Sequence, residues 1–370
     1  MRAVLAGGGS AGHVSPLLAL ADRLVADDPA TAIVALGTAT GIEARLVPAR
    51  GYRLHAIPKV PLPRRPSTAL LRLPGNLRRA VREARRAIDE LDAEVVVGFG
   101  GYVSAPAYLA ARQAKVPIVV HEQNSRPGFA NRLGARLTRS VAVSFPGTPL
   151  RHAVRTGLPL RREIVTLDLA ATRPAACAAF GLDPRLTTLL VFGGSLGAQR
   201  LNEVVPQLAP DLAERGVQVV HVSGSGKSVD VPGRPSGGPA YQVEAYVDRM
   251  ELAYAASDFV IGRAGANTVS ELTALGLPAV YVPLPIGNGE QRLNAEPVVA
   301  AGGGLIVADA ELTVDWLRSR LLPVLSDAAA RQAMGHAARG FGRLDADRQL
   351  ADLVRAAADG EVATCEIGRA

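Results

Sequence analysis

The chain has 370 residues, of which 48% are hydrophobic and 20% are charged, proportions typical of a folded globular protein of about two domains. Aromatic residues make up only 4%, which disfavours a nucleic-acid surface built on stacked rings. The two cysteines, Cys177 and Cys365, cannot form a disulfide framework and lack the spacing of zinc ligands. The apolar runs are too short for a signal peptide or a membrane span, so we expect a cytoplasmic protein. From the scarcity of aromatic residues we also expect that it binds no nucleic acid.

The net charge of +7 is concentrated in one segment of the chain. Residues 59–90 contain nine basic and three acidic side chains, which accounts for six of the seven positive charges. From Leu77 to Leu91 apolar residues recur at helical spacing, which predicts an amphipathic helix whose apolar stripe packs on a sheet. Its arginines either rest on anionic lipid headgroups or form an ordinary solvated face. The nine basic residues are Lys59, Arg64, Arg65, Arg72, Arg78, Arg79, Arg82, Arg85 and Arg86.

Short β-branched runs alternate with helical patterns along the whole chain, which predicts parallel sheets covered by helices. The runs form two series, one before and one after Gly157, and each begins with a strand that leads into a glycine-rich turn. We therefore predict two doubly wound Rossmann-like domains, with ligands at the carboxyl ends of the strands and in an interdomain cleft. The predicted strands are Arg2–Ala6, Ala32–Leu36, Arg53–Ile57, Glu94–Gly98, Pro117–His121, Ser140–Ser144, Thr187–Phe192, Val217–Val222, Tyr241–Ala245, Asp258–Ile261, Ala279–Val282 and Gly304–Val307.

The first turn, from Gly7 to His13, has the pattern G-x-G-x-x-G between a strand and a helix. Such a turn is typical of a dinucleotide site, but that site needs an acidic residue after the second strand, where the sequence reads Leu36-Gly37-Thr38. A structural tight turn is the other simple interpretation. His13 favours catalysis instead, because the positive end of a helix dipole disfavours the imidazolium ion and keeps the ring available as a base.

Two further turns predict a nucleotide site in the second half of the chain. The turn at residues 193–198 suits a diphosphate, although it also fits a purely structural turn. The turn at residues 262–268 leads into a helix with Glu271, whose carboxylate can accept hydrogen bonds from a ribose diol or simply complement the helix dipole. Gln291 and Asn294 carry amides suited to sugar hydroxyls. Since no Asp-x-Asp motif stands in a suitable loop, we predict a site without a metal.

These motifs, in this order, closely resemble those of MurG, a family of bacterial peptidoglycan glycosyltransferases. The resemblance covers nearly the whole chain and implies the GT-B fold, with a domain of residues 1–160, a second of residues 161–341, a helix at about 342–359 that packs back on the first, and a tail of residues 360–370. The matching segments are GGSAGH at 8–13, GFGGYVSAP at 98–106, HEQN at 121–124, GGSLGA at 193–198, AGANTVSE at 264–271 and EQRLNA at 290–295.

The resemblance also implies the reaction and the site. The enzyme would be an inverting hexosyltransferase that moves N-acetylglucosamine (GlcNAc) from UDP-GlcNAc to the undecaprenyl-diphospho-N-acetylmuramoyl-pentapeptide lipid I, giving lipid II, with His13 as candidate general base and no cofactor. Glu271 would bind the ribose, Val247 the uracil and Gln291 the sugar. Further donor-side residues would be Ser10, Ala11, Gly12, Asn124, Arg161, Ser195, Ala266, Asn267, Thr268, Val269 and Ser270. The acceptor would lie near Ser10–Gly12 and near Gly100, Gly101, Tyr102, His121 and Glu122.

The same resemblance implies a peripheral protein on the cytoplasmic face of the plasma membrane, where anionic lipids and proteins of cell-wall synthesis or cell division would be its partners. Three other functions remain open at this point. They are a glycosyltransferase with another nucleotide sugar or a soluble acceptor, an NAD-dependent oxidoreductase, and a non-catalytic subunit that binds a nucleotide sugar or the membrane.

Overall fold

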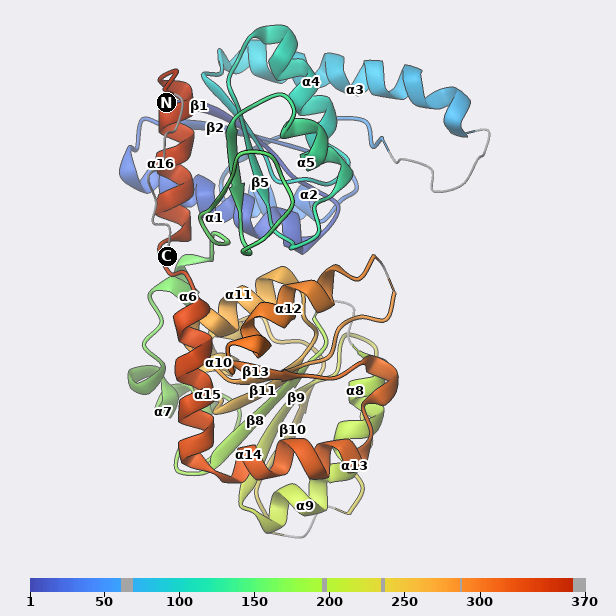
Figure 1. The fold of residues 1–370 in the computed structure, drawn as a ribbon, viewed down its shortest axis with the longest axis vertical. Helices are drawn as coiled ribbons and strands as arrows, with labels where there is room; N and C mark the ends of the chain where they lie inside the picture. Colours follow the sequence, from blue (N-terminus) through green and yellow to red (C-terminus); the bar gives the residue numbers. More distant parts are fainter. Residues whose placement is uncertain (61–68, 195–197, 234–236, 287, 362–370) are drawn as a thin grey trace. The chain divides into compact units, whose positions relative to one another are not determined.

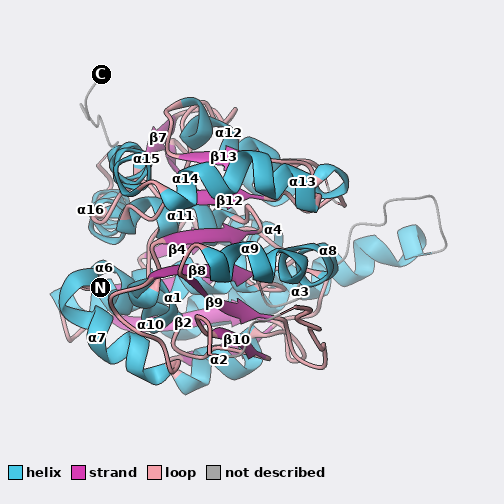
Figure 2. Ribbon diagram, turned by 90° about the horizontal axis from the view of Figure 1, so that it is seen from below, coloured by secondary structure: helices cyan, strands magenta, loops and turns pink. Residues whose placement is uncertain are grey.

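The computed structural model describes residues 1–60, 69–194, 198–233, 237–286 and 288–361, and it divides the chain into two compact units. The first unit combines residues Met1–Arg161 with the C-terminal segment that begins at Leu344, and the second unit contains Arg162–Arg343. Figure 1 shows the elements in sequence colours, and Figure 2 shows that strands and helices occur in both units. Because the predicted tail falls mainly on residues 362–370, most of it lies outside the described residues.

The first unit contains a parallel sheet of seven strands in the order β3-β2-β1-β4-β5-β6-β7. Five of these strands are almost entirely buried, as expected for a sheet covered on both faces: β1, β2, β4, β5 and β6. The chain order reverses between β1 and β4, and a doubly wound domain binds its ligands at such a switch point. The strands are β1 (Arg2–Ala6), β2 (Ala32–Gly37), β3 (Arg53–Ala56), β4 (Val95–Gly98), β5 (Ile118–Glu122), β6 (Ser140–Val143) and β7 (Ala153–Arg155).

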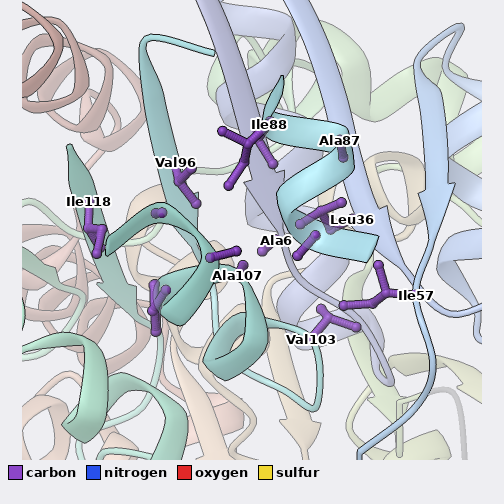
Figure 3. Packing of buried hydrophobic residues seen from close by; sticks show 14 of the residues in the cluster. Ala6, Leu36, Ile57, Ala87, Ile88, Val96, Val103, Ala107 and Ile118 are labelled. Atoms are coloured by element: carbon purple, nitrogen blue, oxygen red, sulfur yellow. The ribbon is translucent and has the colours of Figure 1, made fainter. Parts of the chain in front are cut away.

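Helices cover both faces of this sheet, so alternate residues of each strand enter two different cores. In Figure 3, Ala87 and Ile88 of α3 and Ala107 of α4 lie over strand residues that include Leu36 and Val96. On the opposite face, α1 and α16 pack on the alternate strand residues. The helices of this unit are α1 (Ala11–Asp27), α2 (Glu43–Ala49), α3 (Ala69–Leu91), α4 (Ser104–Ala114), α5 (Phe129–Gly134) and α16 (Ala346–Ala358).

The second unit contains a parallel sheet of six strands in the order β10-β9-β8-β11-β12-β13, with its switch point between β8 and β11. A core of buried aliphatic and aromatic residues lies between this sheet and the helices α8 and α14. The strands are β8 (Thr187–Phe192), β9 (Val217–Val222), β10 (Tyr241–Glu244), β11 (Phe259–Gly262), β12 (Ala279–Tyr281) and β13 (Gly304–Ile306). The α-helices are α6 (Arg162–Val165), α7 (Leu169–Ala179), α8 (Gln199–Val204), α9 (Ala209–Glu214), α10 (Met250–Ala256), α11 (Ala266–Leu275), α12 (Glu290–Ala300), α13 (Val314–Trp316), α14 (Leu322–Ser326) and α15 (Ala328–Phe341).

The predicted class of two doubly wound α/β domains is confirmed, and the twelve predicted strands are present with ends that differ by at most one residue. Strand β7 was not predicted. It has three residues at the edge of the sheet, its first residue is exposed, and it therefore lacks the apolar run that marks the buried strands.

The amphipathic helix predicted from Leu77 to Leu91 is confirmed in its position and its buried stripe, since Val81, Ala84 and Ile88 are buried. Its start is different, because α3 begins at Ala69 and continues through Pro74. Pro74 removes one backbone hydrogen bond from α3, and the helix is present on both sides of it. Figure 1 shows that the N-terminal turns of α3 extend beyond the other elements of the first unit.

Candidate active site

The first glycine-rich turn joins β1 to α1 at the switch point of the first unit. Gly9 has a φ of +87°, in the region that residues with a side chain rarely adopt. Ser10 is the N-cap of α1, so the amides of Ala11 and Gly12, in the first turn of the helix, have no acceptor within it. The turn therefore presents backbone N–H groups next to His13.

His13 lies in the first turn of α1 and is half-buried. Its Nδ1 atom is 2.8 Å from the Ser10 hydroxyl oxygen. Burial lowers the pKa of His13 to about 4, although the negative charge of Glu43 and a hydrogen bond with the Gly8 backbone raise it. The imidazole is therefore neutral at neutral pH and can accept a proton.

A second glycine-rich turn, which follows β4, packs directly on the first. Gly100 and Gly101 have φ angles of +90° and +77°. A Cβ atom built on Gly101 would lie 2.4 Å from the Gly8 carbonyl oxygen, and one on Gly100 would lie 3.2 Å from the His13 ring. Both positions therefore require glycine if the two turns are to touch.

Tyr102, the next residue of this turn, is 43% exposed, and its ring lies close to Gly9. The Nζ atom of Lys59 is 4.9 Å from the centre of the ring, in the geometry of a cation–π contact. Tyr102 and Lys59 thus present an aromatic face and a positive charge beside the first turn.

Glu122, the last residue of β5, is connected to the second glycine-rich turn through Asn131. The buried Glu122 carboxylate accepts hydrogen bonds from the amides of Asn124 and Gly128, at 3.0 Å each, and from the Asn131 side chain at 2.9 Å. The Asn131 side chain also lies next to Gly100. Burial raises the pKa of the Glu122 carboxyl, although these hydrogen bonds act in the opposite direction. Glu122 therefore fixes the segment after β5 and the Asn131 side chain that lies next to Gly100.

His121 has a different environment from His13. Its side chain is fully buried, and its Nε2 atom lies 3.0 Å from the Gly157 carbonyl oxygen. Burial lowers the pKa of His121 to about 4. The ring thus links β5 to the segment after β7 and offers no exposed atom to an acceptor.

Sequence reasoning missed Glu43, the first residue of α2. A dinucleotide site would have an acidic residue at the end of the second strand. Glu43 instead comes five residues after Thr38, and its side chain extends back toward the end of that strand. Its side chain accepts hydrogen bonds from the Gly9 amide and from the amide and hydroxyl of Thr38. The only sequence signal was a pair of glycines before Glu43: Gly37, which precedes Thr38, and Gly41, two residues before Glu43.

In the second unit, the predicted residues from Ala266 to Ser270 form the first turns of α11, directly after β11. Gly265 is the N-cap, and the amides of Ala266, Asn267 and Thr268 have no acceptor within the helix. Together with the helix dipole these amides attract an anion. The side-chain oxygen of Asn267 is buried, and no described group forms a hydrogen bond with it. Ser195, the other residue expected at the diphosphate, lies outside the described residues.

The carboxylate of Glu271 is held in place by a second residue that the sequence did not reveal. The Tyr254 hydroxyl, from α10, donates a hydrogen bond of 2.7 Å to Glu271. Tyr254 is fully buried and packs edge-on against Phe192, the last residue of β8. Glu271 itself is 8% exposed, so its position is fixed by the protein before any ligand binds.

Gln291, in α12, joins this helix to the turn that precedes α11 and to the segment after β12. Its side-chain carbonyl accepts hydrogen bonds from the Ala264 amide, at 3.2 Å, and from the Leu284 amide, at 2.9 Å. Asn294 is fully buried and donates to the Ala264 carbonyl, so it supports the turn and presents no amide to a sugar. The interpretation of Asn294 as a sugar-reading residue was wrong, because spacing does not show which face of α12 is buried.

Two further predicted residues, Val247 and Arg161, belong to other segments of the chain. Val247 is half-buried and follows the edge strand β10, which β9 and β8 separate from β11. Arg161 is half-buried and is the last residue of the N-terminal segment of the first unit. Among the described residues, no three His, Cys, Asp or Glu side chains form a group that could hold a metal ion. No helix in the described part of the chain has the length and apolar character needed to cross a membrane.

The comparisons with known proteins agree with this fold. Residues 3–143 match the glycosyltransferase family 28 N-terminal domain, and residues 188–350 match the glycosyltransferase family 28 C-terminal domain. The structure resembles the calicheamicin glycosyltransferase CalG4 with a TM-score of 0.67 at 18% identity, over 97% of this chain and 99% of that one, which supports the fold alone. The fold and the two strand-end sites therefore define a glycosyltransferase of the GT-B class.

More similar relatives narrow this class. A protein of Streptomyces avermitilis named UDP-N-acetylglucosamine--N-acetylmuramyl-(pentapeptide) pyrophosphoryl-undecaprenol N-acetylglucosamine transferase is 57% identical over 354 residues, 96% of this chain and 98% of its own. Its namesake from Streptomyces coelicolor is 56% identical over 96% of this chain and 97% of its own. A crystal structure of Acinetobacter baumannii MurG has a TM-score of 0.75 at 29% identity, over 96% of this chain and 99% of that one. The chain belongs to the MurG family of glycosyltransferases and is an enzyme.

Proposed function

We propose that this enzyme transfers GlcNAc from UDP-GlcNAc to lipid I, giving lipid II, with His13 as the general base. The observation that carries this proposal is the position of His13, at the switch point of the first unit and between two glycine-rich turns, where burial lowers the pKa of its ring. Membership of the MurG family supplies the two substrates, since the relatives are named for this reaction. The acceptor diphosphate binds near the Ser10–Gly12 amides and the turn from Gly100 to Tyr102.

The donor binds at the carboxyl ends of β8 and β11. Its diphosphate binds the amides of the first turn of α11 and Ser270, and the ribose hydroxyls bind the Glu271 carboxylate. The family resemblance adds Ser195 and Arg161 as ligands of the diphosphate. Two observations support this arrangement: the amides at the start of α11, which have no acceptor within the helix, and the hydrogen bond by which Tyr254 orients Glu271. Gln291 contacts the sugar, Val247 contacts the uracil through its backbone, and Asn124 completes the site.

The chemistry follows from these positions. The acceptor hydroxyl oxygen forms a bond to the anomeric carbon of GlcNAc while the bond from that carbon to the diphosphate oxygen breaks, and the configuration inverts. The proton of the hydroxyl passes to the His13 imidazole. The negative charge that develops on the departing UDP is stabilised by the α11 amides and by Arg161.

The direct test of this function uses purified enzyme, radiolabelled UDP-GlcNAc and a lipid I analogue. We expect a labelled disaccharide-lipid product, and we expect UDP-glucose or UDP-galactose to give much less. Equal transfer from these sugars, or transfer to a soluble sugar in preference to the lipid, would favour a different glycosyltransferase. Absence of product from an enzyme that still binds UDP-GlcNAc would favour the non-catalytic alternative.

We further propose that the enzyme docks on the cytoplasmic face of the plasma membrane through α3. Arg78, Arg79 and Arg82 are exposed on this helix, and none of them pairs with a carboxylate in the described part of the chain. In contrast, Arg85 pairs with Asp89, and Arg86 with Glu83. Basic side chains near an anionic bilayer contribute about 1 kcal/mol each, so the three unpaired arginines would together contribute about 3 kcal/mol.

Binding to vesicles of anionic phospholipid tests this docking surface. Replacing Arg78, Arg79 and Arg82 with glutamine should weaken binding by at least about tenfold, because three favourable charges are lost. The matched control replaces Arg85 and Arg86, whose charges are already paired. Equal binding by both variants would mean that this face is simply solvated. Protein partners from cell-wall synthesis or cell division remain a prediction of the family resemblance.

A further inference from the structure

Glu43 is a buried carboxylate inside the first glycine-rich turn. Its side chain is fully buried, and it accepts three hydrogen bonds: 3.0 Å from the Gly9 amide, 2.8 Å from the Thr38 amide and 2.7 Å from the Thr38 hydroxyl. These bonds connect the turn after β1 to the end of β2. No arginine, lysine or histidine forms an ion pair with Glu43 among the residues that the structure describes.

The backbone around Glu43 is shaped to contain it. A Cβ atom built on Gly8, Gly37 or Gly41 would lie 2.6, 2.5 or 2.2 Å from an atom of the Glu43 side chain, closer than real Cβ atoms approach. Burial raises the pKa of the Glu43 carboxyl, but the hydrogen bonds from Thr38 and Gly9 outweigh burial and leave the pKa below its ordinary value. Glu43 therefore carries a full negative charge at neutral pH.

This charge lies in the turn that leads into His13. The Glu43 carboxylate packs against Gly8 and accepts a hydrogen bond from the Gly9 amide, and its negative charge raises the pKa of the His13 ring against the effect of burial. The other groups next to the ring are neutral: the Ser10 hydroxyl before the helix and the Gly100 backbone of the second turn, where the Asn131 side chain, which is bound to Glu122, also lies near Gly100. Among these groups Glu43 is the charge that favours a protonated imidazole.

We propose that Glu43 is a positioning residue for the transfer reaction, which fixes the first glycine-rich turn and makes His13 a stronger base. This proposal rests on the role of His13 proposed above. It also redefines the anion site of the first unit. Because Glu43 already occupies the Gly9 amide, the acceptor diphosphate is left with the amides of Ala11 and Gly12.

The test replaces Glu43 with glutamine, which keeps the size of the side chain but removes the charge and places an amide group near the Gly9 N–H. We expect kcat to fall about tenfold while the KM for UDP-GlcNAc stays within about twofold, because the donor binds in the other unit. Glu94→Gln is the matched control, since Glu94 also accepts a backbone hydrogen bond, from Arg2 at the opposite end of β1. The control should keep the kcat of the unaltered enzyme.

A second readout is independent of turnover. The ring ¹⁵N signals of His13, assigned among the six histidines with a His13→Gln variant, should shift in Glu43→Gln and stay unchanged in Glu94→Gln. If Glu43→Gln is too unstable to study, Thr38→Val removes one hydrogen bond to Glu43 and keeps its charge, and a smaller shift is expected. Unchanged His13 signals in Glu43→Gln would overturn the proposal.

A double variant separates this proposal from the role of His13. In a His13→Gln background, Glu43→Gln should cause less than about a further twofold loss of kcat, because the two residues act as a unit. A full tenfold further loss would overturn action through His13. If instead the ring signals shift but His13→Gln has normal turnover, the positioning of the ring is retained and the proposed base is the part that fails.

Discussion

The two units have the same strand order at their switch points but use buried acidic groups in different ways. In the first unit, Glu43 accepts a hydrogen bond from the Gly9 amide in the turn before His13, and Glu122 accepts hydrogen bonds from backbone amides in the segment after β5. In the second unit, Glu271 accepts a hydrogen bond from the Tyr254 side chain, and the amides at the start of α11 are not used by a carboxylate of the described residues. One unit is arranged around a base, and the other is arranged to attract an anion.

A glycine-rich turn at a switch point does not by itself define an anion site. Both units contain such turns, yet the Gly9 amide already has an internal carboxylate as its acceptor. The function of each turn therefore depends on the side chain that reaches it from a neighbouring helix. Changes in the first unit should therefore lower kcat, and changes in the second unit should raise the KM for the donor.

Replacing His13 with alanine should have the largest effect. We expect kcat to fall by about a hundredfold or more, because general bases typically contribute this much. The KM for UDP-GlcNAc should change by less than about threefold, since the donor binds the second unit. Steady-state kinetics with a lipid I analogue measure both constants. A variant with nearly normal turnover would remove His13 as the base.

Replacing Glu271 with alanine should act mainly on the KM for UDP-GlcNAc. The loss of hydrogen bonds to a charged acceptor should raise the KM for UDP-GlcNAc at least about tenfold, with a smaller change in kcat. Tyr254→Phe keeps the carboxylate and removes the bond that orients it, so it should raise this KM by only a few-fold. An unchanged donor KM in Glu271→Ala would contradict the ribose assignment.

The pH dependence should reflect the lowered pKa of His13. Because burial lowers this pKa to about 4, the ring stays neutral as the pH falls through 6.5, and kcat/KM should remain constant down to about pH 5. Protonation of the base should reduce kcat/KM only nearer pH 4, and circular dichroism would show whether the protein is still folded there. An acid limb centred near 6.5 would contradict an important role for burial of His13.

The smallest expected effect is that of a chelator. Since the α11 amides and Arg161 are proposed to stabilise the departing UDP, turnover in EDTA should equal turnover without it. A loss of activity that Mg²⁺ or Mn²⁺ restores would show that a metal ion shares this task.

Much of the fold was predictable because buried parallel strands have continuous apolar runs, as Val95–Gly98 and Phe259–Gly262 illustrate. Strand β7 was not predictable, since three residues at a sheet edge carry no such run. The glycine-rich turns were visible for a similar local reason. The groups that hold them were not: Glu43 and Gly9 are 34 positions apart, and Tyr254 and Glu271 are 17 apart. Only the topology shows that these residues meet.

The most direct test of this account is a crystal structure of the enzyme with UDP-GlcNAc. We predict that the diphosphate oxygens lie within hydrogen-bonding distance of the Ala266–Thr268 amides and that the ribose hydroxyls contact the Glu271 carboxylate. A diphosphate bound only to the amides around Gly9 in the first unit, with none at α11, would contradict the division of tasks between the two units.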